Sequence, residues 1–176
     1  MLILQAERDA LLKPLLAVTG IVERRHTLPI LSNVLIEKQA GAVSFLATDL
    51  EIQITTASPD DIAGDAFRLT TSAKKLQDIL RAIPGNSMVT LEQQDGRLML
   101  KAGKSRFNLQ TLPADDFPLL SAGSAAQASF SLSQRDLKRL ISQVQYAMAV
   151  QDIRYYLNGL LLQTEGNQVR LISTDG

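Results

Sequence analysis

Few residues in this 176-residue chain could carry out acid–base or nucleophilic chemistry. It has no cysteine and one histidine, His26, which has no carboxylate or nucleophile at a spacing that indicates catalysis. Adjacent carboxylates occur at Asp60-Asp61 and Asp115-Asp116, both near prolines, where turn formation explains them better than catalysis does. Metal-ligand spacings, Gly-rich phosphate loops and nucleophile motifs are absent from the sequence. The sequence therefore predicts a protein that is not an enzyme, with no metal site and no cofactor.

Basic residues are concentrated in three segments whose apolar periodicity predicts helices. These segments span residues 7–25, 73–82 and 133–146. They hold ten basic and five acidic residues and sum to +5, whereas the rest of this chain of zero net charge sums to −5. In the third segment, Arg135, Lys138 and Arg139 fall opposite an apolar face. Repeated basic faces predict salt-sensitive binding to phosphates, and the alternative is that each is only a solvated surface.

The beginning of the chain recurs near its end. An Arg-Asp pair opens a helical segment, an Asn precedes an apolar run, and a Thr-Asp pair closes the unit in both copies. The marks are Arg8-Asp9, Asn33 and Thr48-Asp49, then Arg135-Asp136, Asn158 and Thr174-Asp175. The repeat distance is about 126 residues, the size of a whole domain. We expect a first domain at 1–122, a linker at 123–128 and an incomplete second domain at 129–176.

Within the first domain, one order of elements is expected twice: a strand, a helix and three strands. The first set is predicted at 2–5, 7–25, 33–39, 43–48 and 51–57, and the second at 66–70, 73–83, 88–93, 97–102 and 105–110. Pro14 predicts a kink or a late start of the first helix. The second domain should begin with a strand at 130–132 and continue with strands at 157–163 and 169–173. Helices on one face of antiparallel sheets make an α+β fold.

The composition also indicates the cellular compartment in which the protein is expected. The absence of cysteine fits a reducing environment. The N-terminus lacks the basic region and apolar core of a signal peptide, and no apolar run approaches the roughly 18 residues that span a bilayer. A cytoplasmic protein that does not enter a membrane is therefore expected.

Four motifs carry a resemblance to a known family. They are Leu-Leu-Lys-Pro-Leu at 11–15, Thr-Leu-Pro-Ile-Leu at 27–31, Ser-Arg-Phe-Asn-Leu-Gln-Thr-Leu-Pro-Ala-Asp-Asp-Phe-Pro at 105–118, and Gln-Asp-Ile-Arg-Tyr-Tyr-Leu-Asn-Gly at 151–159. Through them the whole chain resembles the bacterial DNA polymerase III beta subunits, the sliding clamps. The resemblance implies the DNA clamp fold, built of repeated β-α-β-β-β units. It also implies a homodimeric ring of three-domain subunits that encircles duplex DNA and tethers the replicative polymerase for processive synthesis. This chain would be an N-terminal fragment of such a subunit.

The resemblance also implies the residues that act in each role. DNA contacts are implied at Arg25, Lys74 (often Arg in the family), Gln151, Tyr155 and Tyr156. A subunit interface is implied at Lys75, Lys104, Arg106, Phe107 and Leu109. Part of a pocket for short linear motifs of DNA polymerase III and the clamp loader is implied at Leu157, Thr174 and Gly176.

Three alternatives remain open at this point. Phe107 and Leu109 could lie on an exposed edge strand, or both could face the core. One of the two tyrosines could pack in the core instead of stacking on nucleic acid. The whole chain could be a peptide-binding interaction module without DNA binding, with basic helix faces that are only solvated.

Overall fold

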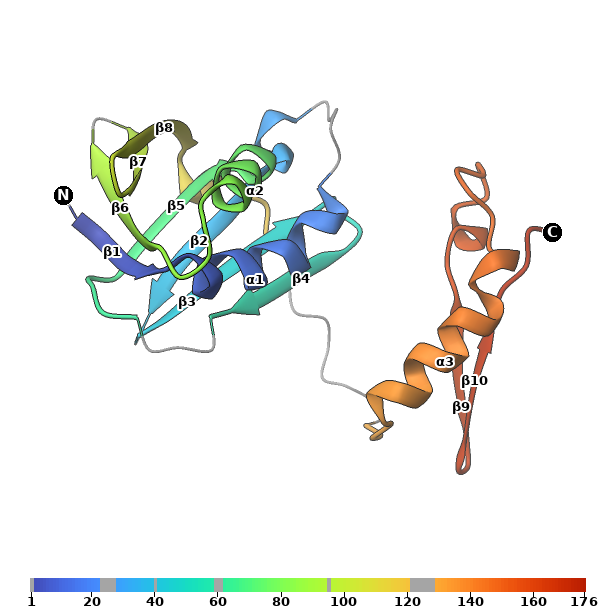
Figure 1. Ribbon diagram of the computed structural model, residues 1–176. Coiled ribbons are helices and arrows are strands. Elements are labelled where there is room, and N and C mark those ends of the chain that lie inside the picture. The colour runs from blue at the N-terminus through green and yellow to red at the C-terminus, as the bar shows by residue number, and fades with distance from the viewer. Residues whose placement is uncertain (1, 23–27, 40, 59–61, 95, 121–128) are drawn as a thin grey trace. The chain divides into compact units, whose positions relative to one another are not determined.

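The computed structural model describes residues 2–22, 28–39, 41–58, 62–94, 96–120 and 129–176 (Figure 1). The chain divides into two compact units, Met1–Ala122 and Gly123–Gly176. Arg25 and His26 lie outside the described residues.

The first unit contains the predicted order of a strand, a helix and three strands twice. The first set is β1 (Leu2–Glu7), α1 (Arg8–Val18), β2 (Asn33–Gln39), β3 (Ala42–Thr48) and β4 (Gln53–Ala57). The second set is β5 (Phe67–Ser72), α2 (Ala73–Ala82), β6 (Met88–Gln94), β7 (Arg97–Ala102) and β8 (Ser105–Leu112). The prediction of an α+β architecture is therefore confirmed.

These strands form one antiparallel sheet in the order β1-β6-β7-β8-β5-β2-β3-β4. The order shows that the two sets exchange their first strands. β1 pairs with β6 of the second set, with Ala6 opposite Val89, and β5 pairs with β2 of the first set, with Leu69 opposite Ile36. Each half of the sheet is therefore completed by a strand from the other half.

The two halves of the sheet meet at a narrow seam between β5 and β8. Two residue pairs join these strands, Thr70 with Leu112 and Thr71 with Thr111. The side chains reinforce the seam, because Thr70 Oγ1 donates to the Leu112 carbonyl at 2.9 Å and Thr71 Oγ1 donates to the Gln110 carbonyl at 3.0 Å. Both threonines are fully buried, so these hydrogen bonds form away from solvent, where leaving the hydroxyls unpaired would be unfavourable.

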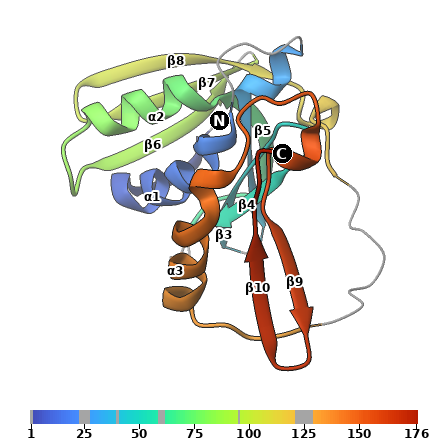
Figure 2. The same cartoon turned by 90° about the vertical axis from the view of Figure 1, so that its right-hand side faces the viewer.

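Helices α1 and α2 lie side by side on one face of the sheet (Figures 1 and 2). Their apolar faces bury Leu15, Val18, Leu76 and Leu80 against the strands. In β3 the buried residues alternate with half-exposed ones, as expected for a strand with one face on the core. Burial of side chains of this size is the main stabilising contribution to such a unit.

Of the two effects expected from Pro14, a late start of the first helix is wrong, and a kink stays a prediction. α1 begins at Arg8 and continues through Pro14. Proline has no N–H to donate to the carbonyl four residues earlier, so one helical hydrogen bond is lost. The burial of Leu11, Leu15 and Val18 on both sides of Pro14 holds the segment in a helix. The Pro14 carbonyl in turn accepts a hydrogen bond from Thr56 Oγ1 at 2.8 Å.

The second unit contains α3 (Gln134–Val144), β9 (Leu161–Glu165) and β10 (Gln168–Ile172). β9 and β10 form an antiparallel hairpin, and α3 packs on β10. α3 is capped at its N-terminus: Ser133 Oγ accepts from the Asp136 N–H at 3.1 Å and donates to Asp136 Oδ2 at 2.5 Å.

Two predicted strands of the second unit are wrong. Residues 130–132 form no strand, and the strand expected at 157–163 begins only at Leu161 because Tyr155–Leu157 forms a 3₁₀ turn. The equivalent first strand in the first unit, β1, pairs with β6 of the other half. The apolar residues of α3 are half-buried and none is fully buried.

We predict that Gly64→Ala destabilises the first unit by about 2–4 kcal/mol. Gly64 has φ 137°, and a Cβ atom there would lie 2.5 Å from the Ile3 backbone carbonyl oxygen. Removal of this steric clash would require the backbone of β1 to move. Urea unfolding followed by circular dichroism measures the change, with Gly20→Ala as the control because a Cβ at Gly20 meets nothing within 4 Å. Equal midpoints for the two variants would contradict the prediction.

Candidate nucleic-acid and partner interfaces

The basic residues of α2 and α3 lie on exposed helix faces, as predicted. On α2, the Lys74 side chain is 54% exposed and its Nζ lies 3.3 Å from Asp78 Oδ1. An exposed pair of this kind contributes little to stability, so Lys74 can exchange Asp78 for another anion at little cost. On α3, Lys138 and Arg139 are exposed opposite the half-buried apolar face. α1 differs, because Arg8 is mostly buried and pairs with Asp9 at 2.9 Å.

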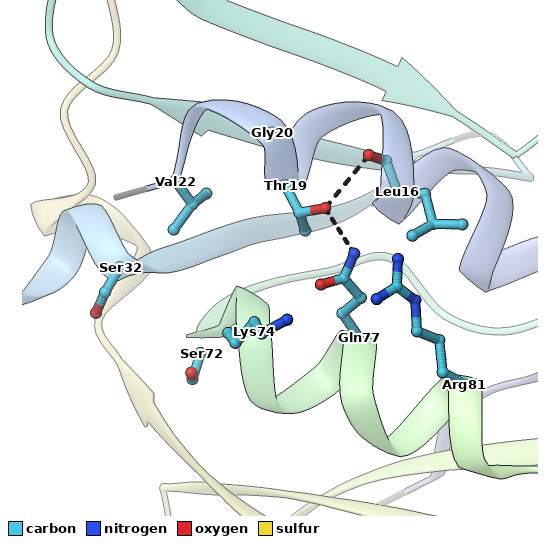
Figure 3. Close-up of a pocket in the computed structure, with 9 residues that line it drawn as sticks. All are labelled: Leu16, Thr19, Gly20, Val22, Ser32, Ser72, Lys74, Gln77 and Arg81. Carbon is cyan, nitrogen blue, oxygen red and sulfur yellow. Dashed lines mark hydrogen bonds between the residues drawn. The ribbon is translucent and has the colours of Figure 1, made fainter. Parts of the chain in front are cut away.

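A groove of about 860 Å³ lies between the end of α1 and α2 (Figure 3). Lys74, Gln77 and Arg81 face it from α2, at positions i, i+3 and i+7 of one helix face. Thr19 Oγ1 links the two helices, since it accepts from Gln77 Nε2 at 3.0 Å and donates to the Leu16 carbonyl at 3.3 Å. The lining residues are Leu16, Thr19, Gly20, Val22, Ser32, Ser72, Lys74, Gln77 and Arg81. Two cations and no acidic residue among them make the groove suited to an anionic group such as a phosphate. Sequence reasoning missed this groove, although the spacing of Lys74, Gln77 and Arg81 indicates a shared face.

In the second unit, the segment that follows α3 presents aromatic and polar side chains to solvent. Gln151 is exposed with a backbone φ of 58°. Tyr155 and Tyr156 are 77% and 67% exposed, and their rings meet edge to face with centroids 5.9 Å apart. Neither tyrosine is buried within the described part of this unit. The alternative that one tyrosine packs in the core of a complete domain stays a prediction. Exposed aromatic rings beside a polar loop can stack on bases or contact a sugar-phosphate backbone.

This segment is held by Asp152, Arg154 and Asn158. Asp152 accepts from Arg154 Nε at 3.0 Å and from its Nη2 at 2.9 Å, and the Asp152 N–H donates to Asn158 Oδ1 at 2.9 Å. The side-chain hydrogen bond from Arg154, followed by that from its backbone N–H, lowers the pKa of Asp152 below the usual aspartate value. The same side-chain bond raises the pKa of Arg154. The segment is thus fixed by a charge-assisted fork pair.

Arg154 also connects the three residues of the expected partner pocket. Its carbonyl accepts from the N–H of buried Leu157 at 2.9 Å, and its Nη2 donates to the Asp175 carbonyl at 3.2 Å. Gly176, at φ 112°, lies against the guanidinium: a Cβ there would be 2.9 Å from Nη1. The Gly176 N–H donates to Thr174 Oγ1 at 3.1 Å. Sequence reasoning did not place Arg154 in this group, although the Asp-x-Arg spacing is a signal for such a pair.

The residues of the expected subunit interface lie on β8, in the turn before it (Lys104) and on α2 (Lys75). Lys75, Lys104 and Arg106 are exposed. The expectation that Leu109 is exposed is wrong, because it is 4% exposed and packs in the core. Phe107 lies on the same face and is half-buried against that core. The alternation of a strand puts residues two apart on one side, and here that side faces inward.

The edge of β8 is nevertheless open along most of its length. β5 pairs with β8 only at residues 111 and 112, so residues 105–109 have no second strand neighbour within the described ranges. The Gln110 carbonyl faces Thr71 of β5, away from β7. By the alternation of an antiparallel pair, the backbone groups of Arg106 and Asn108 face the same way. This edge can accept another strand.

Two family models match the chain: DNA polymerase III beta subunit, N-terminal domain, at residues 2–121, and DNA polymerase III beta subunit, central domain, at residues 131–176. The chain belongs to the DNA polymerase III beta subunit family. The beta sliding clamp of Pseudomonas aeruginosa is 44% identical over 170 residues, which are 97% of this chain and 46% of that protein. The beta sliding clamp of Escherichia coli K12 is 41% identical over the same shares.

Solved structures of this family share the fold. A Pseudomonas aeruginosa sliding clamp bound to griselimycin superposes with a TM-score of 0.92 at 42% identity, over 99% of this chain and 47% of that one. The Caulobacter crescentus beta subunit gives a TM-score of 0.87 at 40% identity, over 98% and 47%. The chain thus spans about half the length of these relatives. Within its described part, no helix is long and apolar enough to cross a membrane.

We predict that Arg154→Ala raises the pKa of Asp152 toward that of an unperturbed aspartate, because the side-chain hydrogen bond that lowers it is removed. In the folded wild-type chain this pKa is lowered, so the pair contributes its stabilisation above the unfolded-state pKa and loses it as the pH falls through the folded-state value. Carboxyl carbon shifts measured by NMR between pH 2 and 6 report the titration. Arg170→Ala serves as the control and should leave the Asp152 curve unchanged. An unaltered Asp152 curve in Arg154→Ala would contradict the prediction.

Proposed function

We propose that this chain is the part of a sliding clamp subunit that contacts duplex DNA and helps to tether the replicative polymerase in the cytoplasm. The observation that supports this most directly is the placement of basic residues. Lys74 and Arg81 of α2 and Arg135 and Lys138 of α3 lie on exposed faces of helices in two units built to one plan. A ring of such units would present those faces to the phosphates of an enclosed duplex.

Encirclement explains why such contacts can be weak. A closed ring leaves DNA only by opening or by sliding off an end, so retention does not require tight binding at each phosphate. Contacts from Lys and Arg to phosphates carry no sequence information and exchange readily along the duplex. The proposed role is therefore non-catalytic: the protein holds a polymerase on DNA and leaves the chemistry to that enzyme.

The DNA contacts that we propose are Arg25, Lys74, Gln151, Tyr155 and Tyr156. The exposure of Lys74 and of both tyrosines supports these assignments. Arg25 follows from the family resemblance alone. We add Arg81, because it shares the groove between α1 and α2 with Lys74.

We propose that the open edge of β8 joins a second subunit in a head-to-tail homodimeric ring. Lys75, Lys104 and Arg106 would supply charges at this interface, and the half-buried Phe107 would be covered further. Leu109 would contribute through its backbone, because its side chain is already buried. Strand addition of this kind supplies backbone hydrogen bonds and removes an exposed edge.

We propose that Leu157, Thr174 and Gly176 form part of a pocket for short linear motifs of DNA polymerase III and the clamp loader. Arg154 would shape this pocket through its contacts with Asp175 and Gly176. The Arg154 guanidinium packs directly against the Gly176 backbone, where a side chain would not fit without a shift of Arg154, and this close packing supports a fixed shape for the proposed pocket.

We predict that Arg135→Gln combined with Lys138→Gln weakens binding of this chain to labelled duplex DNA. The slope of log K against log salt should fall by about two, because two phosphate contacts are lost. Fluorescence anisotropy at several salt concentrations measures the slope. Arg97→Gln combined with Arg170→Gln removes the same charge from strands and should leave the slope unchanged. Wild-type binding without salt dependence would favour a peptide-binding interaction module instead.

The topological part of the proposal concerns a protein that carries this chain within the full length of its relatives. Such a protein, once loaded, should remain on circular duplex and leave the same duplex after it is cut by a restriction enzyme. Gel filtration of the DNA-bound fraction separates the two results. Equal retention on both forms would contradict encirclement.

A further inference from the structure

The turn between β3 and β4 holds a leucine in an unfavourable backbone conformation. Leu50 has φ 80°, a region that residues with a side chain rarely adopt, and its side chain is 44% exposed. Glycine would avoid the strain at this position. An apolar side chain that is both strained and exposed has no evident role in the folded core. Strain of this kind is typical of sites whose side chain contacts a partner.

Hydrogen bonds fix this conformation. The Leu50 N–H donates to Thr48 Oγ1 at 3.0 Å, and that hydroxyl donates to the Ile52 carbonyl at 2.8 Å. Asp49 Oδ1 accepts from the N–H groups of Glu51 at 2.9 Å and of Ile52 at 2.7 Å. Because polar groups on both sides of Leu50 are bonded within the turn, the side chain is presented by a rigid support.

Other exposed apolar side chains belong to the same turn as Leu50 or to the segment that is hydrogen-bonded to it. Ile52 is 54% exposed, and Leu119 and Leu120 are 52% and 38% exposed. The Leu120 N–H donates to Gln53 Oε1 at 2.9 Å, which ties that segment to the residue after Ile52. We call these four residues the Leu50 surface. Exposed apolar groups gathered in this way usually mark an interaction site.

Acidic residues border the Leu50 surface. Asp49 and Glu51 flank Leu50 in the turn, and Asp116 precedes Leu119 by three residues. Glu51 and Asp116 are exposed and Asp49 is half-exposed. This arrangement favours a partner segment that carries apolar side chains with basic residues beside them.

The second unit repeats one hydrogen bond of this turn. There the Gly176 N–H donates to Thr174 Oγ1 at 3.1 Å, as Leu50 does to Thr48 in the first unit, and Gly176 also has a positive φ of 112°. The two positions differ in their surroundings: the Arg154 guanidinium lies against Gly176, whereas Leu50 projects an exposed apolar side chain.

We propose that the Leu50 surface is a second docking site, which binds short peptide segments with apolar side chains and flanking lysine or arginine. It is separate from the pocket proposed at Thr174 and Gly176, and its partner packs against the projecting side chain of Leu50. The comparison between the Leu50 surface and the pocket at Thr174 and Gly176 rests on the proposed function of that pocket. The experiment therefore reports on the two sites separately.

The test titrates the ¹⁵N-labelled chain with the acetylated peptide Lys-Leu-Ala-Leu-Phe-Lys and follows amide shifts by NMR. Amides of residues 48–53 and of Leu119 and Leu120 should move, and Leu50→Ser should weaken binding roughly tenfold, because buried apolar contact is lost. Leu28→Ser, at a leucine of similar exposure (48%), should leave the affinity unchanged. A peptide with glutamate in place of both lysines should bind at least about fivefold more weakly.

The other possible results of the titration distinguish the Leu50 surface from the proposed pocket. Shifts confined to residues 174–176 would overturn this inference and leave the proposed pocket in place. Shifts confined to the Leu50 surface would support the inference and count against the pocket. Equal weakening by Leu50→Ser and Leu28→Ser, or no shifts at 1 mM peptide, would also overturn it.

A second variant separates binding from folding. Leu50→Gly should raise the thermal midpoint by roughly 2–5 °C, because the strain is relieved, while it abolishes peptide binding. A lower midpoint would mean that Leu50 packs for stability, and the inference would fail.

Discussion

In the first unit, each half of the sheet depends on a strand supplied by the other half. β1 lies beside β6, and β5 lies beside β2, so neither half can bury its apolar face with its own strands alone. The helices follow from this arrangement, because α1 and α2 begin directly after the exchanged strands and are drawn together on one face. The groove that holds Lys74, Gln77 and Arg81 is a result of that placement.

Local signals are prominent in the second unit. α3 is capped at Ser133 and amphipathic, and β9 and β10 form a regular hairpin. The residues of α3 that face inward are half-buried, and its basic face is exposed.

Elements that depend on local interactions were predicted from the sequence, whereas features that depend on tertiary contacts were not. Sequence periodicity and turn residues placed β2 and β7 within their observed bounds. The direction of Leu109, the persistence of α1 through Pro14 and the delayed start of β9 depend on tertiary partners that a sequence pattern does not contain. The same division holds for the sites. The basic faces were predicted, whereas the groove and the role of Arg154 required positions distant in sequence to be brought together.

The seam between β5 and β8 has a mechanical consequence. Five or six residue pairs join most neighbouring strands of the sheet, but only Thr70 and Thr71 carry the pairing at this point. A sheet bends most easily where the fewest bonds resist the change in angle, so elastic deformation of the first unit should concentrate along this line. The two halves can then tilt as stiff plates while their buried side chains keep their neighbours. The first unit can therefore change its curvature at the seam between β5 and β8 without unfolding, because the strands on both sides of the seam stay paired.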